Sequence, residues 1–140
     1  MKNEIIKIWI ARCMIGLVVI DNLQAAVFFL VRPDFFVPSF ELTGEAGNAV
    51  IQGIGLLFAM WTVPYVLAMI HPVRYRVSLV EALIMQSIGL LGESVLLFLL
   101  PNGHEILAGS VMRFIYFDGG GLILLLAAFW ITRRLKSTSL

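Results

Sequence analysis

Two apolar segments separated by a five-residue turn constrain this chain more than any other feature. They cover residues 78–100 and 106–132, and the turn between them reads Pro101-Asn102-Gly103-His104-Glu105. Each segment exceeds the roughly 20 apolar residues that a helix needs to cross a bilayer core. Proline, asparagine and glycine are typical of a tight turn. The sequence therefore predicts an antiparallel hairpin of two membrane-spanning helices.

Two further apolar stretches extend this hairpin to a four-helix protein. They are predicted as spans at about 13–31 and 46–70, each ended by a residue that precedes a proline, Arg32 and His71. Only 14% of the residues are charged, against about 25% in soluble domains, and the mean hydropathy is +0.96. We therefore expect one all-α domain over residues 1–140, an integral membrane four-helix bundle surrounded by the lipid bilayer. A net charge of +1 gives no indication of nucleic-acid binding.

Basic residues predict the orientation of this bundle. The first and third predicted loops hold only Arg32. The amino-terminal lead, the second loop and the carboxyl-terminal tail hold the others: Lys2, Lys7, Arg12, Arg74, Arg76, Arg133, Arg134 and Lys136. Short loops rich in lysine and arginine stay in the cytoplasm. We therefore expect a protein of the cell (inner) membrane with both termini cytoplasmic.

Polar side chains inside the predicted spans gather at similar depths. Glu93 lies seven residues before Leu100 and Arg113 lies seven after Ile106, so both are expected about 10 Å below the outer surface, as an acid–base pair. Charged groups at such depths face the bundle interior or a wet cavity. We predict an outward-opening polar pocket that binds a lipophilic small molecule and is lined by Asp21, Gln24, Gln52, Trp61, Gln86, Glu93, Arg113 and Asp118.

The charges of this predicted pocket do not balance. Asp21, Glu93 and Asp118 face the single Arg113, so one ion pair leaves two carboxyl groups, and burial favours the neutral form of an acid. At least one carboxyl is expected to hold a proton, which suits a proton relay, a general acid or a neutral hydrogen-bonding group. The alternative is that these polar groups only fix the register of the helices through hydrogen bonds.

Two other segments leave alternatives open. The loop at 33–46 interleaves Phe35, Phe36 and Phe40 with acidic residues, which suits either a connector anchored at the membrane interface or a lid over a cavity. The run Gly119-Gly120-Gly121 follows Asp118. Glycines there allow close approach, either of another helix or of a flat ligand.

The residues that usually bind metals or cofactors are sparse. Cys13 is the single cysteine, so neither an internal disulfide nor a cysteine-based metal site can form. His71 and His104 are predicted on opposite surfaces and cannot jointly bind a haem. The sequence contains no nucleophile elbow and no phosphate-binding loop. It therefore identifies no metal site, no cofactor and no catalytic residue, and it leaves open whether the protein is an enzyme.

Three sequence features resemble the small DoxX-like membrane proteins. They are Ala11-Arg12 through Gly16-Leu17 at the opening of the first span, a first loop with proline and phenylalanine, and Gly53-x-Gly55-Leu56-Leu57 in the second span. The resemblance implies a four-helix bundle that serves quinone-linked or other redox assemblies, and it implies no catalytic residues. A second resemblance, to sterol-isomerase-type membrane domains with acids and a tryptophan in a helical pocket, rests on Glu93, Asp118 and Trp61.

The functional hypothesis that follows is a non-catalytic one. We expect a small multi-pass protein that binds a lipophilic ligand, or that acts as an accessory subunit of a membrane complex. One alternative is an enzyme that performs acid–base chemistry on a lipid-like substrate, with Glu93 or Asp118 as the acid. Another is a proton-coupled transporter that works as a homo-oligomer, because four helices enclose only a narrow lumen.

Overall fold

The chain folds into four long α-helices, and the computed structural model describes residues 2–135. The helices are α1 (Lys2–Val31), α2 (Gly44–Ile70), α3 (Arg76–Leu99) and α4 (Glu105–Thr132), and two short 3₁₀ helices, η1 (Pro33–Phe35) and η2 (Val37–Phe40), join α1 to α2. All four α-helices are long and apolar enough to cross a membrane, which confirms the predicted all-α four-helix architecture. The first helix begins at Lys2, well before the predicted residue 13, because residues 2–12 contain no proline or glycine to interrupt it.

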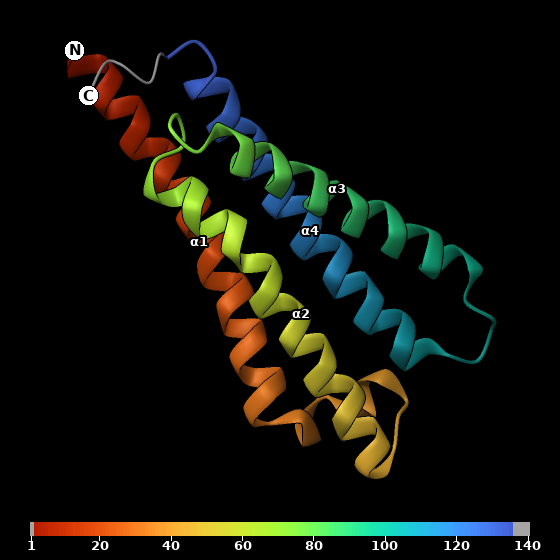
Figure 1. Cartoon of the computed structure of the whole chain (residues 1–140). Coiled ribbons are helices and arrows are strands. Elements are labelled where there is room, and N and C mark those ends of the chain that lie inside the picture. The colour runs from red at the N-terminus through yellow and green to blue at the C-terminus, as the bar shows by residue number, and fades with distance from the viewer. Residues whose placement is uncertain (1, 136–140) are drawn as a thin grey trace.

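The helices form two antiparallel hairpins that meet at one end and separate toward the other (Figure 1). One hairpin is α1 with α2 and the other is α3 with α4, and further contacts join α1 to α4 and α2 to α3. The buried residues of α3 are Ser78, Leu79, Ala82 and Gln86. No described residue of α3 beyond Gln86 is buried, so the bundle is closed as far as Gln86 and forked beyond it.

The closed end contains the main core, to which all four helices contribute. Small side chains there let the backbones approach closely, which is the usual basis of helix packing in membranes. The buried members of this core are Ala11, Ile15, Val18, Val19, Tyr65, Ala68, Leu79, Ala82, Leu125 and Ala128.

Two arginines tie neighbouring helices together at this closed end. Arg12 donates from Nε to the carbonyl of Met69, at 3.1 Å. Arg76, the first residue of α3, donates to the carbonyls of Thr132 and Leu135, both at 3.0 Å. Carbonyls in the last turn of a helix lack helical partners and carry partial negative charge. The two guanidinium groups therefore stabilise the carboxyl-terminal ends of α2 and α4.

The predicted basic side of the protein corresponds to one end of the bundle. The start of α1, the α2–α3 turn and the segment after α4 meet there in a small cluster of Ile8, Val73 and Leu135. Seven of the eight basic residues used to predict the orientation belong to these segments, and Lys136 lies outside the described residues. Which side of a membrane this end faces stays a prediction.

A glycine allows α1 and α2 to approach each other beside the fork. A Cβ atom at Gly55 would lie 2.9 Å from Cβ of Phe29 and 3.1 Å from the carbonyl oxygen of Ala26. Both contacts are shorter than van der Waals packing tolerates, and the second involves backbone that cannot rotate away. Gly53, two residues earlier, has no atom within 4 Å of the same position.

We predict that Gly55→Ala lowers the free energy of unfolding by about 1–3 kcal/mol, because it overpacks the α1–α2 contact. Thermal unfolding in a mild detergent, followed by tryptophan fluorescence, measures the change. Gly53→Ala is the matched control and should leave Tm unchanged or slightly raised, since alanine favours a helix more than glycine does. Equal losses of Tm in the two variants would contradict this account of the contact.

Candidate functional site

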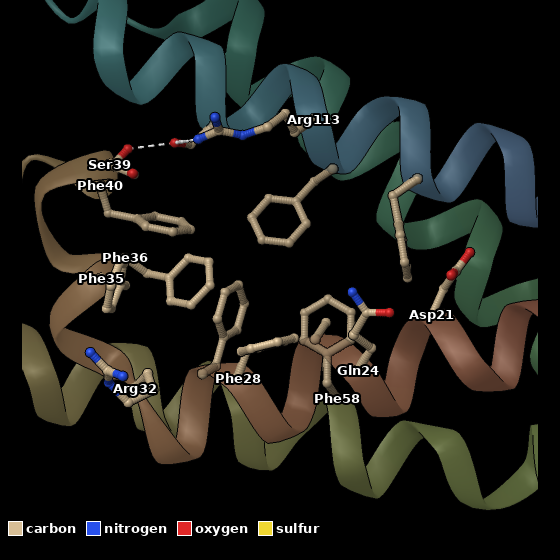
Figure 2. Close-up of a pocket in the computed structure, with 15 residues that line it drawn as sticks. Asp21, Gln24, Phe28, Arg32, Phe35, Phe36, Ser39, Phe40, Phe58 and Arg113 are labelled. Atoms are coloured by element: carbon tan, nitrogen blue, oxygen red, sulfur yellow. Dashed lines mark hydrogen bonds between the residues drawn. The ribbon is translucent and has the colours of Figure 1, made fainter.

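A cavity of about 790 Å³ lies in the fork between the two hairpins. Figure 2 shows it between α1 and α4, with the η1–η2 loop across one end. Its volume falls within the range of about 300–1,000 Å³ that is typical of small-molecule sites. Eight phenylalanines line it: Phe28, Phe29, Phe35, Phe36, Phe40, Phe58, Phe114 and Phe117. We call this cavity the phenylalanine pocket; its polar lining residues are Asp21, Gln24, Arg32, Ser39, Ser110 and Arg113.

Phe29 is the ring on which the walls of the phenylalanine pocket converge. Its centroid lies 4.5 Å from that of Phe36, 6.0 Å from that of Phe58 and 6.3 Å from that of Phe114, all in edge-to-face geometry. Aromatic pairs favour such arrangements at centroid separations of about 4.5–7 Å. One side chain of α1 therefore links the loop, α2 and α4, and it builds a wall of rings whose relative positions are fixed.

The loop between α1 and α2 covers one end of the pocket, as the lid alternative predicted. Phe35, Phe36 and Phe40 all line the cavity, while η1 packs against α2 and η2 against α4. Val37, the first residue of η2, is buried, at 7% exposure, in one apolar cluster with Phe29 and Phe58. The loop therefore closes the fork that the diverging hairpins leave open.

Three polar contacts hold this loop to the start of α4. The Glu41 carboxylate accepts a hydrogen bond from the backbone N–H of Leu107 at 3.1 Å and lies 2.5 Å from Nδ1 of His104. Ser110, in the second turn of α4, donates its hydroxyl proton to the Ser39 carbonyl. The hydrogen bond with His104 and the one from Leu107 hold the pKa of Glu41 below its ordinary value.

The predicted ion pair between Glu93 and Arg113 is wrong. Within residues 2–135 no salt bridge joins them, and Arg113 donates instead to the hydroxyl of Ser110, at 2.7 Å. Glu93 and Arg113 lie at a similar depth along their helices, but their side chains have different neighbours. Arg113 and Asp118 are five residues apart on α4, which turns them about 140° from each other, and Glu93 packs on the Asp118 side.

Glu93 belongs to a chain of polar groups that crosses the bundle outside the phenylalanine pocket. Tyr65 donates its hydroxyl proton to Oε1 of Gln86 at 2.7 Å, and Nε2 of Gln86 donates to Oδ1 of Asp118 at 2.9 Å. The Glu93 carboxyl lies beside that of Asp118, and its Oε2 is shielded from the surface with no hydrogen-bond partner among the described residues. We call these four residues the polar chain; the prediction that an intramembrane carboxyl holds a proton concerns its two acids and stays a prediction.

Glycines give the polar chain its space. A Cβ atom at Gly121 would lie 2.5 Å from Nε2 of Gln86, and one at Gly89 would overlap the Asp118 carboxylate. Gly89 of α3 therefore lies against the Asp118 side chain of α4, and Gly121 of α4 lies against the Gln86 side chain of α3. Of the two alternatives for the run at 119–121, the structure shows helix packing at Gly121, and α4 continues through the run without interruption.

The structure does not bring the eight predicted ligand-binding residues together in one pocket. Those that line the phenylalanine pocket are Asp21, Gln24 and Arg113. Those in the polar chain are Gln86, Glu93 and Asp118. The other two lie at the outer surface of α2: Gln52 is exposed and donates to the carbonyl of Leu30, and Trp61, 47% exposed, contacts the ring of Phe58 from outside the cavity.

Sequence reasoning missed the phenylalanines of the helices, whereas it named Phe35, Phe36 and Phe40 of the loop. Eight of the ten in the chain line the pocket. A depth count does not group them, because Phe29 lies two residues before the end of α1 and Phe114 lies nine residues after the start of α4. Phenylalanine is common in apolar helices, and only the packing of the two hairpins and the loop brings these rings to one cavity.

The arrangement suits binding of an apolar molecule with few polar groups. Among the described lining residues Asp21 is the only carboxylate. In the same part of the chain, no group of three or more histidine, cysteine, aspartate or glutamate side chains could hold a metal ion. The polar lining residues that could contact a ligand include Arg113 and Ser39 near the loop and Gln24 and Asp21 at the opposite end (Figure 2).

We predict that Gln86→Met lowers the free energy of unfolding by about 1–3 kcal/mol, because it removes the amide that donates to Asp118 and leaves the buried Tyr65 hydroxyl only the longer contact with the Ala82 carbonyl, at 3.2 Å. Methionine keeps the unbranched shape that fits against Gly121. Gln52→Met is the control, since its hydrogen bond is exposed. Thermal unfolding in detergent should show a clear loss of Tm for the first variant only.

We predict that acid loosens the attachment of the loop to α4. Because the pKa of Glu41 is lower in the folded than in the unfolded chain, its stabilisation is complete above the ordinary value of 4.5 and is lost as the pH falls through the folded pKa. Tm measured between about pH 6 and pH 3 should therefore fall less steeply for Glu41→Gln than for the wild type. Glu45→Gln, which makes the same charge change in the first turn of α2, should keep the wild-type slope.

Comparison of this chain with protein-family models, with curated proteins and with solved structures finds no match. The resemblance to DoxX-like proteins therefore stays a prediction, and the phenylalanine pocket and the polar chain rest on the geometry described above.

Proposed function

We propose that this chain is a multi-pass membrane protein that binds a lipophilic small molecule in the phenylalanine pocket. The observation that carries the proposal is a cavity of about 790 Å³ walled by eight aromatic rings, with a few polar groups at its two ends. Such a lining is what small-molecule sites in general present. Aromatic walls also offer large contact areas while losing little conformational freedom on binding.

The opening of the pocket supports entry from the bilayer. Phe28 is 50% exposed, and the lining residues Asp21 of α1 and Arg113 of α4 are exposed as well, so the cavity is open to the surroundings along the α1–α4 side. In a membrane-spanning chain this side faces lipid. A lipophilic molecule can therefore reach the pocket laterally without first crossing water.

The predicted orientation gives the pocket a depth in the membrane. With both termini in the cytoplasm, the η1–η2 loop is on the outer side and the pocket lies in the outer half of the bilayer. Asp21, its deepest polar lining residue, precedes the end of α1 at Val31 by ten residues, or about 15 Å of helix. The proposed ligand is therefore one that resides in the outer leaflet.

The alternative functions gain no support from the pocket itself. Glu93 and Asp118, the acids assigned to acid–base chemistry or proton transport, belong to the polar chain and not to the pocket lining. Service to a quinone-linked complex or assembly into a homo-oligomer stays a prediction. Purification in mild detergent tests these alternatives together, because stoichiometric protein partners without any lipophile would favour the accessory role.

We predict that mass spectrometry of the purified wild-type protein identifies a stoichiometric lipophile, and that Phe114→Ala reduces its occupancy. Loss of one buried aromatic contact corresponds to about 1.5–3 kcal/mol, or roughly a 10- to 100-fold weaker affinity. Phe98→Ala is the matched control, because that ring is 87% exposed on α3 and lies outside the pocket. Equal occupancy in both variants, or no lipophile in the wild type, would count against the proposal.

A further inference from the structure

We propose that the phenylalanine pocket selects amphiphiles with an anionic head group, a carboxylate or a phosphate, and that Arg113 binds this head group. The inference rests on the proposed function and specifies its ligand class. Its basis is the charge arrangement of the pocket lining, which contains two cations that are not equivalent.

Arg32 already has a carboxylate partner. Its Nε lies 3.5 Å from Oδ1 of Asp34, and its guanidinium stacks over the ring of Phe35 at 4.5 Å from the centroid. It lies at the mouth of the pocket beside the loop (Figure 2). An anion that approached Arg32 would compete with a carboxylate that is already in place.

Arg113 has no such partner. It lies eight residues after the start of α4 at Glu105, about 12 Å along the helix, and within residues 2–135 no carboxylate forms an ion pair with it. A charge at membrane depth is costly and is normally paired. A bound anion would supply the counter-charge that the protein leaves out.

The orientation of Arg113 is set by a buried serine. The Ser110 hydroxyl, only 2% exposed, accepts a hydrogen bond from Nη2 of Arg113 and donates its own proton to the Ser39 carbonyl. This fixes the guanidinium at the rim where the loop meets α4 (Figure 2). Arginine has five N–H donors in a planar fork, and this bond uses one of them, which leaves donors for two-point contact with a carboxylate or phosphate.

The opposite end of the pocket sets the direction of the ligand. Asp21 lies there beside Gln24, away from the loop (Figure 2). A carboxylate repels an anionic head group, so only the Arg113 end accepts it. The apolar part of the molecule then lies among the rings of Phe29, Phe114 and Phe117.

Tryptophan quenching by brominated probes tests the proposal on the full chain in phosphatidylcholine nanodiscs at pH 8. Trp61 touches Phe58 of the pocket wall with 6.1 Å between ring centroids, whereas Trp9 and Trp130 lie on the helix halves at the closed end. The probes are 9,10-dibromostearic acid and its methyl ester, which differ in head-group charge. The wild type should bind the acid about tenfold or more tightly than the ester, as expected for a charged hydrogen bond.

Arg113→Gln should abolish the preference for the acid and leave binding of the ester unchanged. Arg32→Gln is the matched control and should keep the preference, because that arginine is paired with Asp34. Should Arg113→Gln fail to fold, Ser110→Ala replaces it: the charge stays but the guanidinium is released, so the preference should fall at least severalfold. An unchanged preference in that variant would overturn the assignment of Arg113.

The outcomes separate this inference from the function on which it rests. Equal affinity of the wild type for acid and ester overturns the anion preference and leaves a lipophile pocket in place. Failure of both probes to bind overturns the proposed function as well. Displacement of the acid by dodecyl phosphate supports a free single-chain anion as the ligand, and displacement by phosphatidylglycerol added to the nanodisc supports an anionic bilayer lipid.

Discussion

The hydrogen bonds of Gln86 are the interaction on which the arrangement of the two hairpins depends. This side chain of α3 is 3% exposed and joins the Tyr65 hydroxyl of α2 to the Asp118 carboxylate of α4. Helices in lipid gain little from burying apolar surface against each other, so hydrogen bonds and close packing carry their association. On one side of Gln86 all four helices share a core, and on the other side no described residue of α3 is fully buried. The fork, and with it the space for a pocket, begins at this residue.

What fills the fork is a loop and a set of rings. Where the hairpins separate, Phe114 of α4 still contacts Phe29 of α1, and the η1–η2 loop adds Phe36 and Phe40 to the same set of rings. Phe29 can join them to α2 only because Gly55 lets the α1 and α2 backbones approach closely. The polar chain and the phenylalanine pocket are therefore neighbouring consequences of one geometry. The polar chain joins the two hairpins, and the phenylalanine pocket lies where the hairpins separate.

The elements of the fold could be predicted because each has a local cause. The lengths of the apolar segments and the prolines at 33, 72 and 101 place both ends of α2, α3 and α4, and the carboxyl-terminal end of α1, close to where the structure has them. The candidate site could be predicted only in part. Depth along a helix follows from counting residues, and three of the residues grouped by depth, Asp21, Gln24 and Arg113, line one cavity. Direction around the helix and the divergence of the hairpins depend on packing between distant residues, so Glu93 was paired with the wrong partner.

The sequence by itself determined the number of helices, their order, their apolar character and the basic end of the bundle, since these depend on residue type and on spacing along the chain. Only the tertiary structure decided that Arg113 and Glu93 point to different sites, that Asp118 meets Gln86, and that eight phenylalanines enclose one cavity. The physical reason is that these four helices are apolar around most of their circumference. Their rotation is therefore set by a few glycines and hydrogen bonds, whose partners lie 20 residues or more away in the chain.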